Sequence, residues 1–397
     1  MATSQPRPKI VIVGGGVAGL EVASTLGRRW RGRADAPSIT LVDRESAHVW
    51  KPMLHTIAAG TRDISQQQTA YLAQARDAGF AYRPGELWGL DRNAREIELA
   101  AQHAPDGRLL VPASRLGYDL LVLSTGSQAN DFGTPGVAEH CWNIDSRRQA
   151  DAFNREVRIR LLQCLTQDAP LHIAIVGGGA TGVELAAELV QLVEAVTAYG
   201  APDLAGRINI TLIEAGPRLL AGFPEDISSA TRTRLEAIGI RVLTETQVKA
   251  ATPKAFMLAN GDELQATRDP AIYALGDCAA LTPEGASRAL PPTAQVAHQQ
   301  AKYLIDALPR ALEGRPVRDF RYRDMGALVS LADYDAFGSL GQFGLFHGQT
   351  FRGRLAQISH VMLYRSHQAR IHGFWRGGRL WLVDRLNSRV RAPIRLD

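Results

Sequence analysis

A glycine-rich segment occurs twice in this chain of 397 residues, about 160 residues apart. Residues 9–20 read KIVIVGGGVAGL, and residues 172–183 read HIAIVGGGATGV. Each copy has a short apolar run, then three glycines, then a helical pattern, which is the order in which a dinucleotide-binding unit begins. Because the segment is duplicated, we predict an α/β fold that contains two Rossmann-like nucleotide-binding domains.

The first copy has the spacing G-x-G-x-x-G at Gly14, Gly16 and Gly19. The first glycine permits a tight turn, the second lets a pyrophosphate approach the backbone, and the third lets the helix lie close to the strand. Asp43 ends the next predicted strand, where a carboxylate suits the ribose of an adenosine. A glycine-rich loop without a ligand is the alternative, but strand, helix and acid are all present, so we predict a bound nucleotide.

The second copy has the same spacing at Gly177, Gly179 and Gly182, and Glu214 ends the strand that follows. A carboxylate at that place accepts hydrogen bonds from a free 2′-hydroxyl and repels a 2′-phosphate. We therefore predict NADH rather than NADPH as the second nucleotide. Arg218 lies close enough in the sequence to weaken this preference.

A third motif, an apolar run followed by Gly276 and Asp277, lies about 260 residues after the first fingerprint. Together with Thr125 and Gly126, which follow another apolar run, it resembles the two-dinucleotide-binding flavoprotein family that includes glutathione reductase. The resemblance implies that the first unit binds FAD and the second binds NAD(P)H. It also implies that the chain returns to the first unit, where all four of these residues contact FAD.

Cysteine placement separates the branches of this family. The chain has only three cysteines, and the spacing of Cys141, Cys164 and Cys278 allows neither a disulfide framework nor a CxxC metal site, so we predict no metal. Residues 44–60 contain no cysteine, whereas the disulfide reductases of the family carry a redox-active pair there. A sulfide:quinone oxidoreductase stays open as an alternative, because Cys278 directly follows the Gly-Asp motif.

Three segments resemble the type II NADH dehydrogenases, which are single-subunit NADH:quinone oxidoreductases that pump no protons. These are residues 51–55 (KPMLH), 177–184 (GGGATGVE) and 294–300 (AQVAHQQ). The resemblance implies an enzyme with FAD and NADH as cofactors. Hydride passes from NADH to FAD, and two electrons then pass to a membrane quinone.

The same resemblance assigns residues to the site. Lys51, Ala294 and Gln295 are expected at the flavin, and Glu184 is expected near both the nicotinamide and the flavin. Gln295 and His298 are expected to border the quinone, so Glu184, Gln295 and His298 are the predicted catalytic residues. Two plainer interpretations stay open: Glu184 as a carboxylate that favours a helix N-terminus, and His298 as a structural histidine.

The last part of the chain carries the excess positive charge. From Arg352 onward there are ten arginines and two aspartates, a balance of +8, with Trp375, Trp381 and several aliphatic residues between them. This pattern favours a C-terminal segment that lies on an anionic lipid surface. Nucleic-acid binding and a solvated cap on the domain are the competing interpretations, and we predict no nucleic-acid partner.

The predicted location is the cytoplasmic face of the inner membrane, with the protein bound peripherally. Residues 1–9 are polar and lack the apolar stretch of a signal peptide. No uncharged apolar run reaches the ~18 residues of a membrane-spanning helix. Whether the protein is a homodimer is left open.

These motifs divide the chain into three regions. The FAD-binding domain is discontinuous, because the Gly-Asp motif lies far from the first fingerprint. We assign residues 1–130 and 267–320 to the FAD domain, 145–265 to the NADH domain, and 321–397 to a C-terminal membrane-surface and quinone-site region.

The NADH domain is shorter than the resemblance implies. A strand is predicted at residues 248–258 with a turn at Asn260-Gly261, and only residues 262–266 then precede Thr267. In the family several tens of residues lie here, after the position of Glu263, and they include the last strand of the domain. We expect an exposed sheet edge, weaker NADH binding and a less stable second domain. A catalytically impaired FAD-binding relic, or a natural chain longer than this sequence, are the alternatives.

Overall fold

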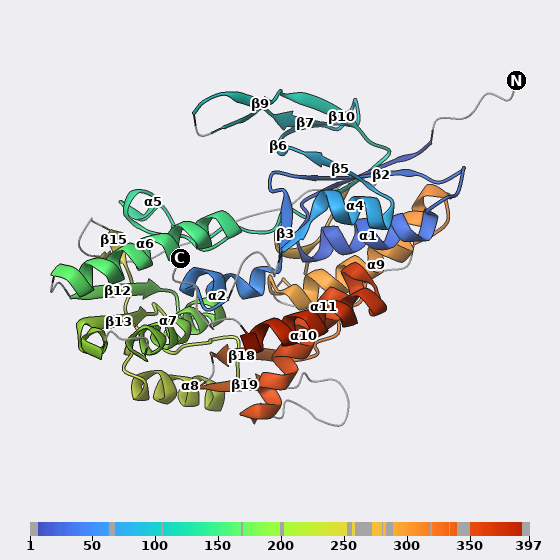
Figure 1. Cartoon of the computed structure of the whole chain (residues 1–397). Helices are drawn as coiled ribbons and strands as arrows, with labels where there is room; N and C mark the ends of the chain where they lie inside the picture. Colours follow the sequence, from blue (N-terminus) through green and yellow to red (C-terminus); the bar gives the residue numbers. More distant parts are fainter. Residues whose placement is uncertain are drawn as a thin grey trace, which may run out of the picture.

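The computed structural model has two Rossmann units, with C-terminal strands and helices that contact both of them (Figure 1). The predicted α/β Rossmann-like class is confirmed. The Asn260-Gly261 turn, the shortened interval after Glu263, and Arg391 and Arg395 of the basic tail lie outside the described residues. The structure describes residues 7–62, 68–104, 106–167, 170–198, 202–251, 256–258, 272–279, 281–282, 289–317, 320–332, 334–339 and 350–390.

The first unit is a five-stranded parallel sheet in the order β17-β11-β1-β2-β5. Four of the five residues of β1 are buried, because this strand has neighbours on both sides. β17 pairs in parallel with β11, so the chain returns to the first unit as the Gly-Asp motif predicted. The strands are β1 (Lys9–Val13), β2 (Ser38–Asp43), β5 (Ala81–Pro84), β11 (Leu120–Leu123) and β17 (Ile272–Ala274).

Helices cover one face of this sheet, and a small antiparallel sheet covers the other. Ile10 and Ile12 of β1 share a core cluster with the helices, whereas Val11 and Val13 share one with the antiparallel sheet. This alternation follows from the two-residue period of a strand. The covering elements are α1 (Val17–Trp30), α4 (Tyr71–Ala78) and α9 (Ala294–Leu312) on one side, and β6 (Glu86–Asp91), β7 (Glu96–Ala100) and β10 (Ser114–Gly117) on the other.

The second unit has a three-stranded parallel sheet, in the order β12-β13-β14, among the described residues. In that part of the chain β12 pairs only with β13, so β12 is an edge strand. The strands are β12 (Leu171–Val176), β13 (Ile208–Ile213) and β14 (Arg241–Leu243), and the helices are α6 (Arg147–Gln167), α7 (Ala180–Ala198), the short 3-10 helix η2 (Pro202–Arg207) and α8 (Glu225–Ala237).

The single strand predicted at residues 248–258 is wrong. The structure has two strands there, β15 (Lys249–Ala251) and β16 (Phe256–Leu258), which pair with each other in an antiparallel manner. The sequence between them contains Pro253, which lacks the N–H that a continuous strand would donate. A chain reversal therefore replaces the expected continuous strand.

The C-terminal region begins with a three-stranded antiparallel sheet and ends in two helices. Phe337 of this sheet belongs to the core cluster of the second unit, and Ile371 of α10 belongs to that of the first. None of the described helices combines the length and apolar character needed to cross a bilayer. The elements are β18 (Ala327–Leu331), β19 (Asp335–Ser339), β20 (Thr350–Arg352), α10 (Arg354–His372) and α11 (Phe374–Val390).

Short elements join the two units. Helix α2 (Leu54–Ala59) follows β2 in the sequence but packs in the core of the second unit, where Asn154 Nδ2 donates to Ala58 O at 3.2 Å. The segment before α2 therefore crosses between the units. The remaining elements are β3 (Ala47–Val49), η1 (Lys51–Met53), β4 (Gln68–Ala70), β8 (Gln102–His103), β9 (Leu109–Val111), α5 (Val137–His140) and η3 (Gly276–Cys278).

Candidate active site

The first glycine turn is tight where the chain packs and open where a ligand approaches. Gly14 has φ +99°, and a side chain there would overlap Ser124 O. Gly19 lies against Gly14 O, so α1 begins close to β1. Beside Gly16, no atom lies within 4 Å of the place that a Cβ would take. The turn thus has the open position that a pyrophosphate needs.

The second glycine turn repeats this shape. Gly177 has φ +109°, and a Cβ at Gly182 would overlap Gly177 O. At Gly179 the space beside the backbone is open, as it is at Gly16. Both turns end at the N-terminus of a helix, α1 or α7, whose unpaired N–H groups and dipole attract phosphate. We call the two turns the first cradle and the second cradle.

An acidic residue holds each turn in the same way. Asp43 Oδ2 accepts the N–H of Gly15 at 2.6 Å, and Glu214 Oε2 accepts the N–H of Gly178 at 2.6 Å. Burial raises the pKa of Asp43, while its bonds from backbone N–H groups act in the opposite direction. The two acids therefore occupy equivalent places at the end of the second strand of each unit.

Arg218, which weakened the preference for NADH, is bound to its own loop. Its guanidinium donates to Phe223 O at 2.9 Å and to Ala221 O at 2.8 Å, with Leu220 O at 3.4 Å. These bonds hold the side chain against the backbone. The Arg218 guanidinium, which could have bound a 2′-phosphate, is thus occupied by loop carbonyls.

A cleft of ≈ 1900 Å³ is lined by residues of both cradles. Pockets for one small ligand usually measure roughly 300–1,000 Å³, so this cleft is large enough for more than one. Thirteen of the predicted site residues line it. They are Gly16, Lys51, Gly126, Gly177, Gly179, Gly182, Glu184, Glu214, Gly276, Asp277, Ala294, Gln295 and His298.

The other four predicted residues do not line the cleft: Gly14, Gly19, Asp43 and Thr125. Gly14 and Gly19 lie inside the tight turn, where they let the backbone approach itself. The Asp43 carboxylate faces the backbone of Gly15, and Thr125 is exposed outside the cleft. The glycine spacing alone does not separate the packed side of the turn, at Gly14 and Gly19, from its open side at Gly16.

Segments that are far apart in the sequence close the first cradle. Lys51 Nζ donates to Ser127 O at 2.9 Å and lies 3.7 Å from an Asp145 oxygen. Ser127 Oγ in turn donates to Asp277 Oδ2 at 2.9 Å. Gly276 has φ +74°, and its N–H donates to Gln300 Oε1 at 2.7 Å. The Lys51 segment, the residues after β11 and the Gly-Asp motif thus meet at one place, as the resemblance implied.

The N-terminus of α9 opens into the cleft. Thr293 Oγ1 caps the helix by accepting the N–H of Val296. Ala294 and Gln295 at the first turn line the cleft. The Gln295 side chain is fixed, because Nε2 donates to Tyr322 Oη at 2.7 Å and Oε1 accepts the N–H of Met325 at 3.2 Å.

Glu184 is the fifth residue of α7, beyond its first turn, and is buried between three regions. Its Oε2 is 3.3 Å from His55 Nδ1 on α2, and its Oε1 accepts the N–H of Ser330 on β18 at 3.0 Å. Burial raises the pKa of Glu184 to about 8, and the nearby Glu188 adds to the shift. Burial also lowers the pKa of His55 to about 3. At neutral pH the two groups therefore form a neutral pair.

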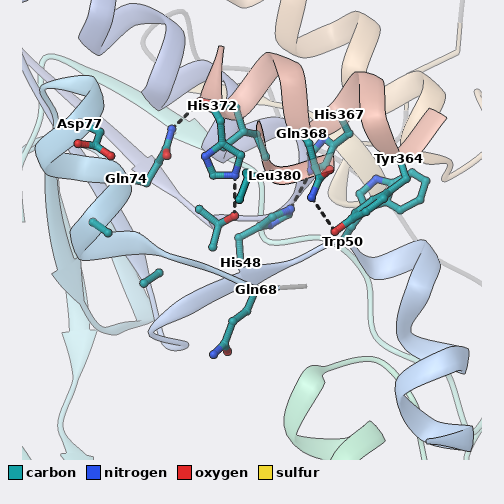
Figure 2. Close-up of a pocket in the computed structure, with 14 residues that line it drawn as sticks. His48, Trp50, Gln68, Gln74, Asp77, Tyr364, His367, Gln368, His372 and Leu380 are labelled. Atoms are coloured by element: carbon teal, nitrogen blue, oxygen red, sulfur yellow. Dashed lines mark hydrogen bonds between the residues drawn. The ribbon is translucent and has the colours of Figure 1, made fainter. Parts of the chain in front are cut away.

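A smaller cavity of ≈ 200 Å³ lies between β4, α4 and the C-terminal helices (Figure 2). His48 Nδ1 is 2.9 Å from Gly15 O, and His48 Nε2 is 2.9 Å from His367 Nε2. Burial lowers the pKa of His48 to about 4, so its neutral ring donates through Nδ1 and accepts through Nε2. Trp50 stacks on His367, with ring centroids 5.8 Å apart. This contact anchors α10 behind the first cradle.

Two cradles on one cleft define a class of oxidoreductase with two dinucleotide sites, and comparisons with known proteins agree. Residues 8–265 match the family described as pyridine nucleotide-disulphide oxidoreductase. The chain is 36% identical to the type II NADH:quinone oxidoreductase of Haemophilus influenzae, over 98% of this chain and 99% of that protein. The chain therefore belongs to the pyridine nucleotide-disulphide oxidoreductase family and, within it, to the type II NADH:quinone oxidoreductases. The resemblance predicted from the sequence is confirmed.

Solved structures share the fold. The structure of NDH2 from Plasmodium falciparum in complex with NADH gives a TM-score of 0.77 at 17% identity and covers 98% of this chain and 100% of that one. The sulfide:quinone oxidoreductase from the hyperthermophilic bacterium Aquifex aeolicus gives 0.67 at 16% identity and covers 92% and 91%. The alignment with the Haemophilus relative has 443 positions, whereas this chain has 397 residues.

Sequence reasoning gave no role to several residues that the structure brings to the site. His55 contacts Glu184, and Glu21 contacts His298. Arg370 of α10 lines the cleft beside them. Spacing alone does not show which histidine meets which acid. One signal was present, because Glu21 follows the third glycine of its repeat by two residues, as Glu184 does in the other repeat.

Proposed function

We propose that FAD binds in the first cradle and NADH in the second, and that the chain catalyses the NADH:quinone oxidoreductase reaction of its family. The observation that carries this proposal is the single cleft lined by both cradles. Bound FAD supplies the chemistry that takes a hydride and releases single or paired electrons. The chain then has to bind and orient two substrates, and to handle protons, beside that cofactor.

The residues of the first cradle fit FAD. The open positions at Gly16 and Gly126 leave room for phosphate and for the flavin segment next to the backbone. The N-terminus of α1 supplies N–H donors for the pyrophosphate. Asp277 offers a carboxylate to the ribityl chain, and Lys51 brings a positive charge to the flavin side of the cleft.

NADH fits the second cradle for two reasons. Glu214 lines the cleft at the end of β13, where its carboxylate accepts bonds from a free 2′-hydroxyl and repels a 2′-phosphate. Arg218 is bound to loop carbonyls and does not offset that repulsion. The nicotinamide then lies toward the flavin, near Glu184.

For quinone reduction we propose roles for Glu184, Gln295 and His298. The N-terminal dipole of α9 stabilises negative charge that develops in the cleft. Gln295, held by Tyr322 and Met325, presents its backbone N–H at that helix end. His298 lies one helical turn after Ala294 on the same face and lines the same cleft. The neutral Glu184–His55 pair holds a proton near the nicotinamide side.

We further propose that α10 and α11 rest on an anionic lipid surface at the cytoplasmic face of the membrane. Phe374 and Trp375 are 78% and 80% exposed, and arginines lie between the apolar residues of α11. Such a surface suits the interface of a bilayer with acidic headgroups. Flotation with vesicles of phosphatidylglycerol and with vesicles of phosphatidylcholine tests this: only the acidic vesicles should retain the protein, and equal retention, or none, contradicts it. A homodimer stays a prediction.

A shortened second domain also belongs to the proposal. The alignment with the Haemophilus relative is 46 positions longer than this chain, so at least that many aligned positions have no residue here. The edge position of β12 among the described residues supports a loss on that side of the sheet. We expect weaker NADH binding than in a complete domain. Intact-mass measurement of the purified natural protein distinguishes a shortened chain from an incomplete sequence.

The activity is tested by donor and acceptor specificity. NADH should reduce a soluble ubiquinone analogue when the FAD-loaded protein is present, and sulfide should not. Blocking the cysteines with a thiol reagent should leave the rate unchanged, because no cysteine takes part. Reduction of the quinone by sulfide, abolished by the thiol reagent, would establish the alternative sulfide:quinone oxidoreductase instead.

A further inference from the structure

The duplication includes a buried glutamate in each unit. Residues 14–21 read GGGVAGLE and residues 177–184 read GGGATGVE, so Glu21 and Glu184 hold the same place in the two repeats. Glu21 is 4% exposed and Glu184 is 6% exposed. Each contacts a histidine from another part of the chain, His298 for Glu21 and His55 for Glu184.

The Glu21–His298 contact is the shorter of the two. Glu21 Oε2 lies 2.8 Å from His298 Nδ1, whereas Glu184 Oε2 lies 3.3 Å from His55 Nδ1. His298 is on α9 one helical turn after Ala294, and both residues line the cleft. A carboxylate can only accept, so Nδ1 of His298 must carry the proton of this bond. Nε2 is then the ring nitrogen left for a ligand in the cleft, and it has no partner among the described residues.

We propose that Glu21 is a positioning residue for proton transfer to the quinone: it fixes the ring and tautomer of His298 and stabilises its protonated form. This inference rests on the proposed role of His298 at the quinone. A buried carboxylate that holds a histidine in one tautomer is a general device for acid–base catalysis. Here the carboxylate comes from the fifth residue of α1, the helix that follows the first cradle.

The charged groups around His298 come from two elements. Glu21 faces it from α1, and Arg370 and His367 face it from α10. Arg370 Nε lies 3.5 Å from the same Glu21 oxygen that His298 contacts. Arg28 of α1 also interacts electrostatically with Glu21, and its guanidinium donates to Ile371 O at 2.7 Å. Two guanidiniums therefore lie near the buried carboxyl group of Glu21. Among the described residues no guanidinium contacts Glu184, and burial raises the pKa of Glu184 to about 8.

The proton step balances with groups already named. Reduction of a quinone to a quinol adds two electrons and two protons. The hydride of NADH accounts for both electrons and one proton, and the solvent supplies the second proton through His298. The Nε2–H bond of protonated His298 breaks as an O–H bond forms on the quinone, and the neutral ring keeps its Nδ1–H on Glu21. Solvent then returns a proton to Nε2, while the electrons come from the NADH that reduced the flavin.

The test follows reoxidation of the NADH-reduced flavin by a soluble quinone, as a function of pH. Glu21→Gln removes the negative charge, so reoxidation should slow at least about tenfold, a part of the roughly 10²–10⁴-fold that a positioned proton donor contributes. The alkaline limb of the pH profile should move to lower pH by about 1 unit or more, because the imidazolium loses its counter-charge. Flavin reduction by NADH should not change. Asp306→Asn, an exposed acid on the same helix α9, is the matched control and should behave as the wild type.

Arg370→Met tests the inference without changing Glu21, so it remains informative if Glu21→Gln folds poorly, and a double variant tests whether Glu21 acts through His298. Arg370→Met removes a positive charge beside Glu21 and His298, so the alkaline limb should move to higher pH. In the double variant Glu21→Gln/His298→Ala, the loss should equal that of His298→Ala alone, because Glu21 acts through that ring. Unshifted limbs in both single variants, or additive losses in the double variant, overturn the inference. A wild type that quinone cannot reoxidise overturns the proposed function instead.

Discussion

The strand before the first cradle and the strand before the second have nearly the same sequence but very different surroundings. Val13 and Val176 each precede the first glycine of their repeat, yet Val13 is 4% exposed and Val176 is 53% exposed. β1 has neighbours on both sides, whereas β12 pairs only with β13 in the described part of the chain. An antiparallel sheet covers the Val13 face of β1.

The two cradles themselves do not differ in this way. Both first glycines have positive φ, both second glycines are open, and both second-strand acids accept the N–H of the residue after the first glycine, Gly15 or Gly178, at 2.6 Å. Cradle geometry is therefore set locally by the glycine spacing and the acid. The packing of the sheet that carries it depends on distant strands, and the second unit has fewer of these among the described residues.

The largest expected effect comes from closing the open position of each cradle. A Cβ at Gly16 or Gly179 meets no protein atom, so Gly16→Ala and Gly179→Ala should fold normally and obstruct only the ligand. Loss of a charge-assisted phosphate contact is worth about 1.5–3 kcal/mol, or roughly 10–150-fold in affinity. Gly16→Ala should lower FAD content, and Gly179→Ala should raise the KM for NADH with FAD content unchanged.

Flavin absorbance and steady-state kinetics measure this pair of effects. Gly206→Ala, also made in open space but away from the cleft, is the control. If Gly179→Ala lost FAD and Gly16→Ala kept it, the assignment of the two nucleotides would be reversed.

The next effect tests the sheet rather than the cradle. Val13→Ala removes buried methyl groups and should lower the free energy of unfolding by about 2 kcal/mol. Val176→Ala, at the equivalent place on an exposed edge strand, should cost less than about 0.5 kcal/mol. Urea unfolding of both variants measures the difference. Equal losses would mean that Val176 is covered in solution, and the contrast between the units would then disappear.

The smallest effect is the pH dependence of stability at the Glu184–His55 pair. Glu184 has an ordinary pKa of 4.5 that burial raises to about 8, so the folded state binds the extra proton and stability falls as pH rises through that window. His55 acts oppositely between its lowered pKa of about 3 and its ordinary 6.5. The two contributions offset each other between pH 4.5 and 6.5. Above it, stability should fall by on the order of 1 kcal/mol per pH unit until about pH 8.

Urea unfolding at a series of pH values between 6 and 8.5 reveals this slope. Glu184→Gln should remove it, and Glu194→Gln, an exposed acid on the same helix α7, should keep it. A wild type whose stability does not change between pH 6.5 and 8 would show that Glu184 is ionised in the folded protein.

Local patterns in the sequence predicted much of the fold. The glycine spacing located α1 and α7, because this signal lies within the turn that it forms. Helix α6 was not predicted, since only a few of its 21 residues are buried and its apolar pattern is weak. The strand at 248–258 was wrong because an apolar run does not show where the chain reverses.

Site residues could be predicted where a single sequence motif brings them to the cleft without help from another part of the chain. Thirteen of the predicted site residues line the cleft, as their motifs implied. The Glu184–His55 and Glu21–His298 pairs were not predictable, because each joins elements whose approach depends on how the two units pack. His367 likewise received no role, although its ring meets His48 behind the first cradle.

The most direct test of two cradles sharing one cleft is the flavin spectrum during an anaerobic titration with NADH. After incubation with FAD, the purified protein should retain the yellow flavin band, and NADH should bleach it. A colourless protein would contradict the first cradle as an FAD site. A band that dithionite bleaches but NADH does not would contradict the delivery of hydride from the second cradle to the first.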